Sequence, residues 1–354
     1  MADHKNQHFV PRCVLKPFTL DGEDKAINLY TLRADLLVQN APVKHQCARD
    51  YLYGEDGVIE AGLAQLEGQY GKALDRIREG TDTEDDLNTL RFFAYLQLRR
   101  TEMAILNMKA SEEELFAQIF GEDQPEHPPQ KYYMLQSLKM CFDSREKIED
   151  LKVCMVENRT DVEFVICDDP AIYTNRYATE KVKREMFGVI SSGLTMGMPI
   201  APKLAVLCYD GLVYEPVNLE NGRIILNTVE DVEALNELQY LRASGSIYFS
   251  SWDSRDYVRA QFIANGDRRV KEFAVFEHLI FVKSTKDGDV FKAGSAEEAK
   301  KAGRSIVHSF FRYPTPSRWI TELPYRKAIT YYTNGSEAGH VRKEKWLKEQ
   351  QSWS

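Results

Sequence analysis

The chain has 354 residues, of which 43% are hydrophobic and 28% are charged, and its formal net charge is −8. This composition is typical of a globular protein and excludes a disordered or fibrous chain. The negative charge argues against a surface covered by nucleic acid, although it is compatible with a local basic groove.

The sequence carries no sign of a membrane or secreted protein. No apolar stretch reaches the roughly 18–20 residues of a membrane span, and the first eight residues lack the hydrophobic region of a signal peptide. The six cysteines have no CxxC pair and no regular spacing, and several lie in apolar runs. We therefore expect a soluble, cytoplasmic protein with reduced, mostly buried thiols and no membrane partner.

Apolar spacing predicts the first elements in chain order. Residues 8–18 are typical of a short helical turn closed by Pro17, and 26–32 alternate as a strand does. Residues 57–79 have helical spacing and end at Gly80, a typical C-cap.

A second helix is expected directly afterwards. The pattern Thr81-x-x-Glu84 matches a capping box, and the helix is expected to run to about residue 110. Shorter helical segments follow near 111–120 and 130–150. Residues 57–150 are thus predicted to form a helical bundle or layer.

From Val153 onward the apolar period changes to that of strands. Strands are predicted at 152–157 and 162–167, joined by a turn at 158–161. A hairpin is predicted around Asp210-Gly211, between strands 205–209 and 212–214, because this dipeptide favours tight turns.

The last part alternates helices and strands. Two helices (229–242 and 254–264) flank a strand at 246–250, and further on a strand is expected at 273–282 and a polar helix at 343–351. The fold class predicted is α+β, with an N-terminal helical layer packed on a mostly antiparallel sheet. We expect a core of residues 1–265, with its helical part at about 57–150 and its sheet part at about 151–265. Residues 266–354 are expected to form an extension or appendage.

Common catalytic motifs are absent from the sequence: it contains no GxxxxGK[ST], no GxGxxG after a strand, no HExxH and no GxSxG. Polar residues in apolar surroundings are therefore the candidates. Glu60 and Glu67 are seven residues apart on one predicted helix face, beside an apolar stripe. A carboxylate there needs a cation, a metal or a hydrogen-bond donor, unless it lies at the wet margin of the stripe.

The next helix places Gln97, Arg100 and Thr101 in line with apolar residues. A buried arginine needs a partner, and we predict that Glu67 lies within ion-pair reach of Arg100. The pair is either structural or the arginine binds an anion or stabilises a transition state.

Two further candidates lie elsewhere in the chain. The Cys-Asp-Asp-Pro stretch at 167–170 ends a predicted strand, so Asp168 is expected there facing a cavity, with a simple Asx turn as the alternative. His8 lies beside the N-terminal apolar turn and is either an acid/base group or a hydrogen-bonded core residue.

Several of these motifs, in this order, resemble a known family. They are His8-Phe-Val-Pro11, Asp50-Tyr-Leu-Tyr53, Glu60-x-x-Leu63-x-x-x-Glu67, Gln97-x-x-Arg100-Thr101, Phe164–Pro170, Met198–Pro202 and the segment from Asn236 to Ser251. The set resembles the bacterial and fungal family called domain of unknown function 4238, over residues 4–262. The chain departs from the family pattern at Ile166-Cys167, where the family prefers Thr-Ser, and at Asp169, where it has Asn.

Two functional hypotheses follow. In the first the chain is a hydrolase, such as a nuclease acting in phage defence or as a toxin, with catalytic His8, Glu67, Arg100 and Asp168. Gln97 and Asn236 would bind the substrate, and Glu60, Glu67 and Asp168 would hold a divalent metal. In the second it is a non-catalytic binding or regulatory protein whose Arg–Glu network is structural. Nucleic acid, a protein partner and a second copy of the chain are the candidate partners.

Overall fold

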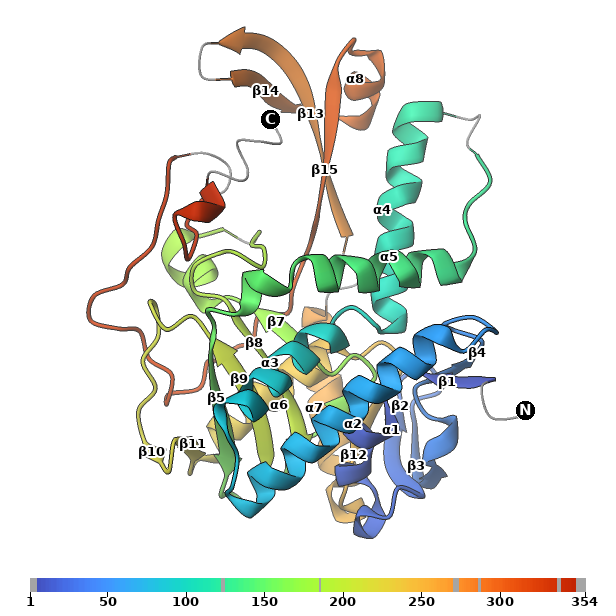
Figure 1. Cartoon of the computed structure of the whole chain (residues 1–354), viewed down its shortest axis with the longest axis vertical. Helices are drawn as coiled ribbons and strands as arrows, with labels where there is room; N and C mark the ends of the chain where they lie inside the picture. The colour runs from blue at the N-terminus through green and yellow to red at the C-terminus, as the bar shows by residue number, and fades with distance from the viewer. Residues whose placement is uncertain are drawn as a thin grey trace.

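The computed structural model describes residues 5–121, 125–184, 186–269, 274–285, 288–335 and 339–347. It has the predicted α+β fold, with helices packed on mostly antiparallel sheets (Figure 1). None of the helices in these ranges combines the length and apolar character that crossing a membrane requires. Five of the six cysteines are buried and Cys13 is half-buried, and all are free thiols.

The largest sheet has six strands, all antiparallel except for one parallel pair, β11 with β5. In spatial order its strands are β10 (Leu219–Glu220), β11 (Arg223–Leu226), β5 (Lys152–Asn158), β9 (Leu204–Tyr209), β8 (Thr195–Ala201) and β7 (Ile172–Thr174). The short strand β7 is therefore an edge strand. This position matters because residues on both sides of β7 line cavities.

A four-stranded antiparallel sheet lies beside the first. Its order is β3 (Leu36–Pro42), β2 (Ala26–Thr31), β12 (Ser246–Phe249) and β6 (Ile166–Cys167). A two-stranded ribbon joins β1 (Asn6–His8) to β4 (Ala48–Asp50). Four residues, 168–171, connect β6 of one sheet to β7 of the other.

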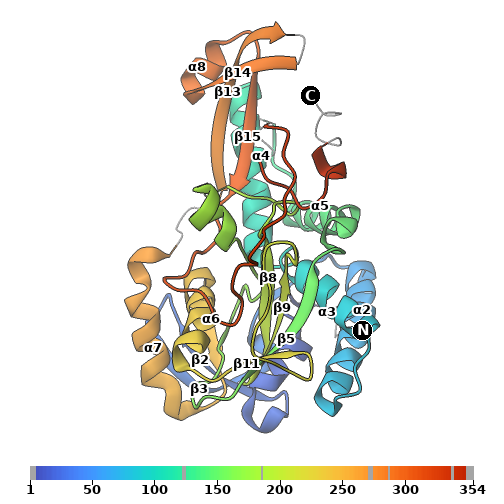
Figure 2. The ribbon, with the colours of Figure 1, turned by 90° about the vertical axis from the view of Figure 1, so that its left-hand side faces the viewer.

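Helices cover both faces of the six-stranded sheet, as Figure 2 shows. On one side lie α2 (Val58–Glu79) and α3 (Glu84–Gln97), which follow the short helix α1 (Arg12–Leu15). On the other side lies α6 (Val229–Arg242), and α7 (Arg255–Ala264) packs on α6 and on β2 of the four-stranded sheet. The apolar stripe of α2 packs on α3, where the rings of Tyr70 and Phe93 stack with centroids 3.9 Å apart.

The predicted second helix is in fact two helices. Helix α3 begins after Thr83, whose capping box uses Asp86, so the box expected at Thr81 and Glu84 was wrong by two residues. It ends at Gln97, and α4 (Glu102–Phe120) begins after Thr101, whose side chain accepts a hydrogen bond from the Ala104 amide. A continuous helix to residue 110 was therefore wrong. A polar N-cap residue next to a buried arginine marks the break.

Two strand predictions were also wrong. The segment 162–167 supplies only the short strand β6, which pairs with β12 in the other sheet and not with β5. The Asp210-Gly211 turn forms no hairpin, because β9 pairs with the preceding strand β8. Asp210 instead accepts hydrogen bonds from the Gly193 and Leu212 amides and so turns the chain away from the sheet.

Residues after 265 form a projecting three-stranded sheet and then a segment that packs on the core. A three-stranded sheet of β14 (Gly288–Gly294), β13 (Ala274–Thr285) and β15 (Ser305–Phe311) projects from the core beside α4 and carries α8 (Ala296–Lys301) (Figure 1). Helix α5 (Gln130–Asp143) crosses below it. The chain then returns to the core. The predicted domain boundary at 265 stays a prediction, as does most of the 343–351 helix, of which a turn at 345–347 lies within the described residues.

We call residues 312–325 the strap, because they run across the α6 face of the six-stranded sheet. Two buried carboxylates of α6 hold this segment. Asp231 accepts a hydrogen bond of 2.7 Å from the Thr321 amide, and Glu237 accepts one of 2.8 Å from the Ser317 amide. The strap is thereby fixed to the core by main-chain contacts as well as by its apolar side chains.

Candidate functional site

Arg100 is the centre of a buried polar network. Its guanidinium donates to Glu67 Oε1 at 2.8 Å, to the His8 carbonyl at 3.1 Å and to the Tyr53 hydroxyl at 3.2 Å. Only 1% of Arg100 is exposed. Burial opposes its charge, but Tyr53 and Glu67 outweigh that effect and raise the pKa of Arg100. The predicted Glu67–Arg100 ion pair is confirmed.

Amide side chains extend this network to the N-terminal segment. Gln97 is fully buried and donates to the Phe9 carbonyl at 2.8 Å. Gln7, also fully buried, donates to the Gly54 carbonyl at 2.9 Å and to Glu60 Oε2 at 3.3 Å. The residues that the sequence singled out on α2, on α3 and in the turn after α3 thus hold the N-terminal segment against the helices.

His8 takes part through its main chain. Its carbonyl accepts hydrogen bonds from Arg100 and from the Tyr53 hydroxyl. The ring Nε2 is buried and has no hydrogen-bond partner in the described part of the chain. Burial lowers the pKa of the His8 ring, which favours the neutral form. A catalytic role of this ring stays a prediction.

The three carboxylates proposed as metal ligands each have another partner. Glu60 accepts from Gln7, Glu67 from Arg100, and Asp168 from Ser244. Within the described ranges, no group of three or more His, Cys, Asp or Glu side chains is placed to hold a metal ion. The donor set predicted for a divalent cation is thus not gathered in one place.

Asp168 directly follows strand β6, as predicted. Its carboxylate accepts a hydrogen bond of 2.9 Å from the Ser244 amide and one of 2.5 Å from the Ser244 hydroxyl. Burial raises the pKa of Asp168. Asp168, His8, Glu67 and Arg100 line neither the cavity between the six-stranded sheet and α6 nor the cavity beside Tyr173. Asp168 therefore joins β6 to the turn after α6.

The neighbouring Asp169 forms a buried ion pair that sequence reasoning missed. Asp169 is fully buried, and its Oδ2 lies 2.5 Å from Arg242 Nη2, near the end of α6. Seventy-three positions separate the two residues, so no local pattern relates them. The signal available was the second acidic residue of the Cys-Asp-Asp-Pro stretch, a charge in an otherwise apolar run that needs a partner when buried.

Two amides on α6 satisfy the main chain around β6. Asn236 accepts from the Val165 amide at 3.0 Å and donates to the Glu163 carbonyl at 2.8 Å. Gln239 accepts from the Cys167 amide at 3.0 Å and donates to the Pro170 carbonyl at 2.9 Å. These bonds replace those of a neighbouring strand. Both hydrogen-bonding ends of the Asn236 side chain are therefore engaged within the fold.

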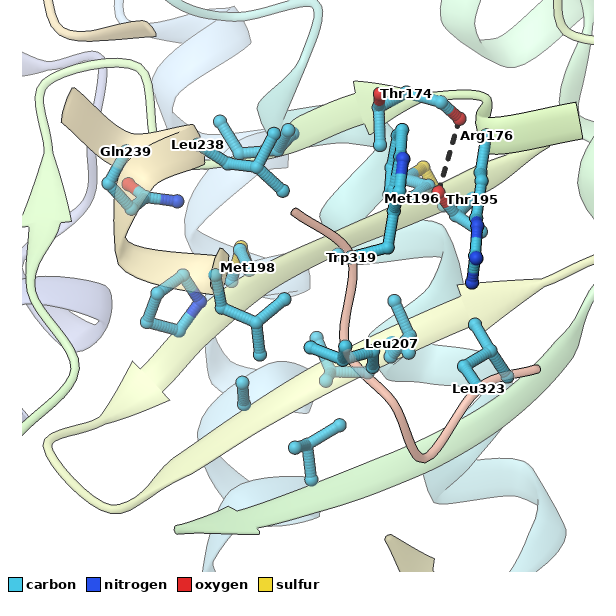
Figure 3. Close-up of a pocket in the computed structure, with 18 of the residues that line it drawn as sticks. Thr174, Arg176, Thr195, Met196, Met198, Leu207, Leu238, Gln239, Trp319 and Leu323 are labelled. Atoms are coloured by element: carbon cyan, nitrogen blue, oxygen red, sulfur yellow. Dashed lines mark hydrogen bonds between the residues drawn. The ribbon is translucent and has the colours of Figure 1, made fainter. Parts of the chain in front are cut away.

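An apolar groove lies between the six-stranded sheet, α6 and the strap. It encloses about 710 Å³ of space outside protein atoms, part of it open to solvent. Figure 3 shows side chains from all three elements lining it. Those labelled are Thr174, Arg176, Thr195, Met196, Met198, Leu207, Leu238, Gln239, Trp319 and Leu323.

The few polar groups of the groove have partners within the protein. Thr195 donates to the Thr174 carbonyl at 3.1 Å, and Thr174 donates to the Pro314 carbonyl at 2.8 Å. Arg176 bonds Glu180 at 3.0 Å and lies over the ring of Tyr325. The groove therefore offers apolar contact in the main, with one cation at its polar end.

Sequence reasoning missed this groove. Its sheet wall includes Met198 and Pro199 and its α6 wall includes Leu238, all within segments that carry the family resemblance. The apolar side chains that Trp319 and the residues after it contribute were the available signal, but their partner surfaces on the sheet and on α6 lie far earlier in the chain.

These features define an α+β protein with a buried arginine network and an apolar groove. The family model described as "Protein of unknown function (DUF4238)" matches residues 6–253. The chain belongs to this family, as its motifs indicated. Comparisons with curated proteins and with solved structures return no match. The matched segment contains the sheet and α6 walls of the groove, and the strap lies beyond it.

Proposed function

We propose that the chain is a non-catalytic binding protein for a small, mainly apolar molecule held in the groove. The observation that carries this proposal is the groove itself. A space of about 710 Å³ with an almost entirely apolar lining remains between sheet, helix and strap. Small-molecule sites are typically concave and apolar, with a few polar groups that orient the ligand.

The buried network supports binding over hydrolysis. The groups proposed as catalytic already form hydrogen bonds inside the fold. Arg100 donates to Glu67 and to two other acceptors, and Asp168 accepts from Ser244. A hydrolase needs these groups to reach substrate in a cavity. The hydrolase, nuclease, defence and toxin hypotheses stay predictions.

The test uses the neutral apolar dye N-phenyl-1-naphthylamine, whose fluorescence rises on entering an apolar site. We expect saturable binding to the full chain. Trp319→Ala removes part of the strap wall, and we expect about tenfold weaker binding because large aromatic contacts dominate such sites. Ala205→Phe, which fills the groove from β9, should abolish binding.

The matched control is Trp252→Ala. Trp252 is half-buried like Trp319 but stacks on Phe249, at a ring distance of 6.2 Å, away from the groove. This variant should bind the dye as the wild type does. Equal binding by all four proteins, or no binding by the wild type, would overturn the proposal.

A further inference from the structure

A second cavity lies on the opposite face of β7 from the groove. Ile172 and Thr174 line the groove, whereas Tyr173, between them, lines the second cavity. This follows from the alternation of side chains along a strand. The second cavity encloses about 480 Å³ of space outside protein atoms, part of it open to solvent. Its polar lining comes from Arg99, Asn107, Arg242 and three tyrosines.

Arg99 is a partly buried arginine that lines this cavity. The nearly buried Arg100, Arg242 and Arg342 each pair with a carboxylate, at 2.8, 2.5 and 2.8 Å. No acidic side chain of the described residues forms an ion pair with Arg99. Its guanidinium lies 5.9 Å from the Tyr95 ring centroid. A partly desolvated cation of this kind favours an external anion.

The hydroxyl of Tyr173 is an independent sign of a missing ligand. Tyr173 is only 4% exposed, and within the described ranges its hydroxyl has no hydrogen-bond partner. Buried phenols normally find a partner, because an unmet hydroxyl loses its bonds to water. Tyr173 also lines the cavity, and a small movement of the lining side chains would let a ligand oxygen accept the hydrogen bond of this buried hydroxyl.

The charge and the shape of the cavity lining limit the chemical class of ligand that the second cavity can bind. Arg242 is neutralised by Asp169, so the two arginines and one aspartate leave one net positive charge at the cavity. One positive charge suits a singly charged anion, and the planar guanidinium fork matches a carboxylate. The ring of Tyr313, 4.8 Å from that of Tyr173, adds an aromatic wall. Aromatic ligand rings pack well on such walls.

We propose that this cavity binds a small aromatic carboxylate, which ion-pairs with Arg99, accepts a hydrogen bond from Tyr173 and packs on Tyr313. The site uses other residues than the groove and does not rest on the function proposed for it. The strap supplies Tyr313, so both cavities share this segment as a wall.

The test is calorimetric titration of the full chain with four probes: benzoate, phenyl phosphate, acetate and benzyl alcohol. Benzoate should bind most tightly, because only it combines the ring with a planar single charge. Tyr173→Phe removes one hydroxyl and should weaken benzoate binding about tenfold, as expected for a hydrogen bond to a charged group. Arg99→Lys keeps the charge but loses the fork, and should weaken binding at least as much.

Tyr70→Phe is the matched control. The Tyr70 hydroxyl is also buried and has no partner among the described residues, but Tyr70 stacks on Phe93 and does not line this cavity. Both phenylalanine variants should keep the wild-type melting temperature, because neither hydroxyl bonds within the fold. Only Tyr173→Phe should lose benzoate affinity.

Three results would overturn the proposal. The first is no benzoate binding by the wild type, or equal affinity in wild type and Tyr173→Phe. The second is tighter binding of phenyl phosphate than of benzoate, which would mean that the cavity recognises a phosphate and not a carboxylate. The third is acetate binding as tight as benzoate, which would remove the aromatic wall from recognition. Should Arg99→Lys fail to fold, Tyr173→Phe alone still decides the matter.

Discussion

Replacing Arg100 by alanine should destabilise the fold strongly if its network is structural. The change removes the donors to Glu67, to the His8 carbonyl and to the Tyr53 hydroxyl at once. Breaking a buried ion pair typically costs about 3–5 kcal/mol, because the remaining charge has lost its partner.

The structure places the expected loss toward the lower end of that range. The Glu67 side chain is 27% exposed, so water can hydrate its carboxylate after the arginine is gone. The His8 carbonyl also keeps the hydrogen bond from Tyr53, so it is not orphaned. We expect a loss of about 3 kcal/mol for Arg100→Ala. Arg100→Lys, which can still reach Glu67 with one ammonium, should lose about 1–2 kcal/mol.

Urea unfolding followed by circular dichroism and by fluorescence measures these changes, and agreement of the two signals checks that the transition is two-state. Arg259→Ala is the control. Arg259 forms a two-point ion pair with Asp35, but the two side chains are 43% and 57% exposed, so its removal should leave the midpoint near that of the wild type. A midpoint for Arg100→Ala equal to that of the control would refute the structural role. An intact fold with loss of a cellular effect would then favour the catalytic hypothesis.

Three further predictions concern single contacts, each measured by urea unfolding. Asn236→Ala leaves an amide and a carbonyl beside β6 without partners and should cost about 2–4 kcal/mol; a change within error would show that water replaces the side chain. Because burial raises the pKa of Asp168 above its unfolded value, the folded state binds the proton more tightly, so this group's contribution to stability falls as pH rises through the window above about 4. Asp168→Asn should flatten that fall, and parallel pH profiles of variant and wild type would contradict it. Gly193→Ala should destabilise clearly, since φ is +77° and a Cβ would lie 2.2 Å from that of Tyr177, whereas Gly22→Ala meets no atom within 4 Å and suffers only from its positive φ; equal losses would count against the clash.

The sequence predicted elements well where one face of a helix or strand carries the signal. Helix α2 and its end at Gly80 match the prediction, because a regular apolar stripe and a glycine at φ 69° are local features. Helix α6 and strand β12 also match the prediction, although α6 is buried over most of its surface and carries no single apolar face. The sequence did not predict which strands pair, because β6 has only two residues and its partner β12 lies about 80 positions later. Local alternation cannot identify such a partner.

The candidate site shows the same division. Glu67 and Arg100 were paired correctly from sequence, because each was expected on an apolar helix face and a buried arginine needs a partner, although Arg100 lies in the turn after α3 and not on the helix. Sequence could not predict the pairing of Asp169 with Arg242 or the groove under Trp319, because each depends on how distant segments pack. Buried polar residues were thus found correctly as a group. Their partners, which decide between a structural and a catalytic role, came only from the fold.

Strand β7 and the strap together show where the ligand preference of this chain would arise. Two residues of β7 face the apolar groove and one faces the second cavity, so a shift of this edge strand would alter both cavities. The Thr174 hydroxyl donates to the Pro314 carbonyl, which fixes the strap at the point between Tyr313 in one cavity and Trp319 in the other. The family match ends at residue 253, so the strap that closes both spaces lies outside it. Relatives that share the sheet and α6 but carry a different segment after them would therefore keep one wall of each cavity and differ in the other, and their ligands would differ accordingly.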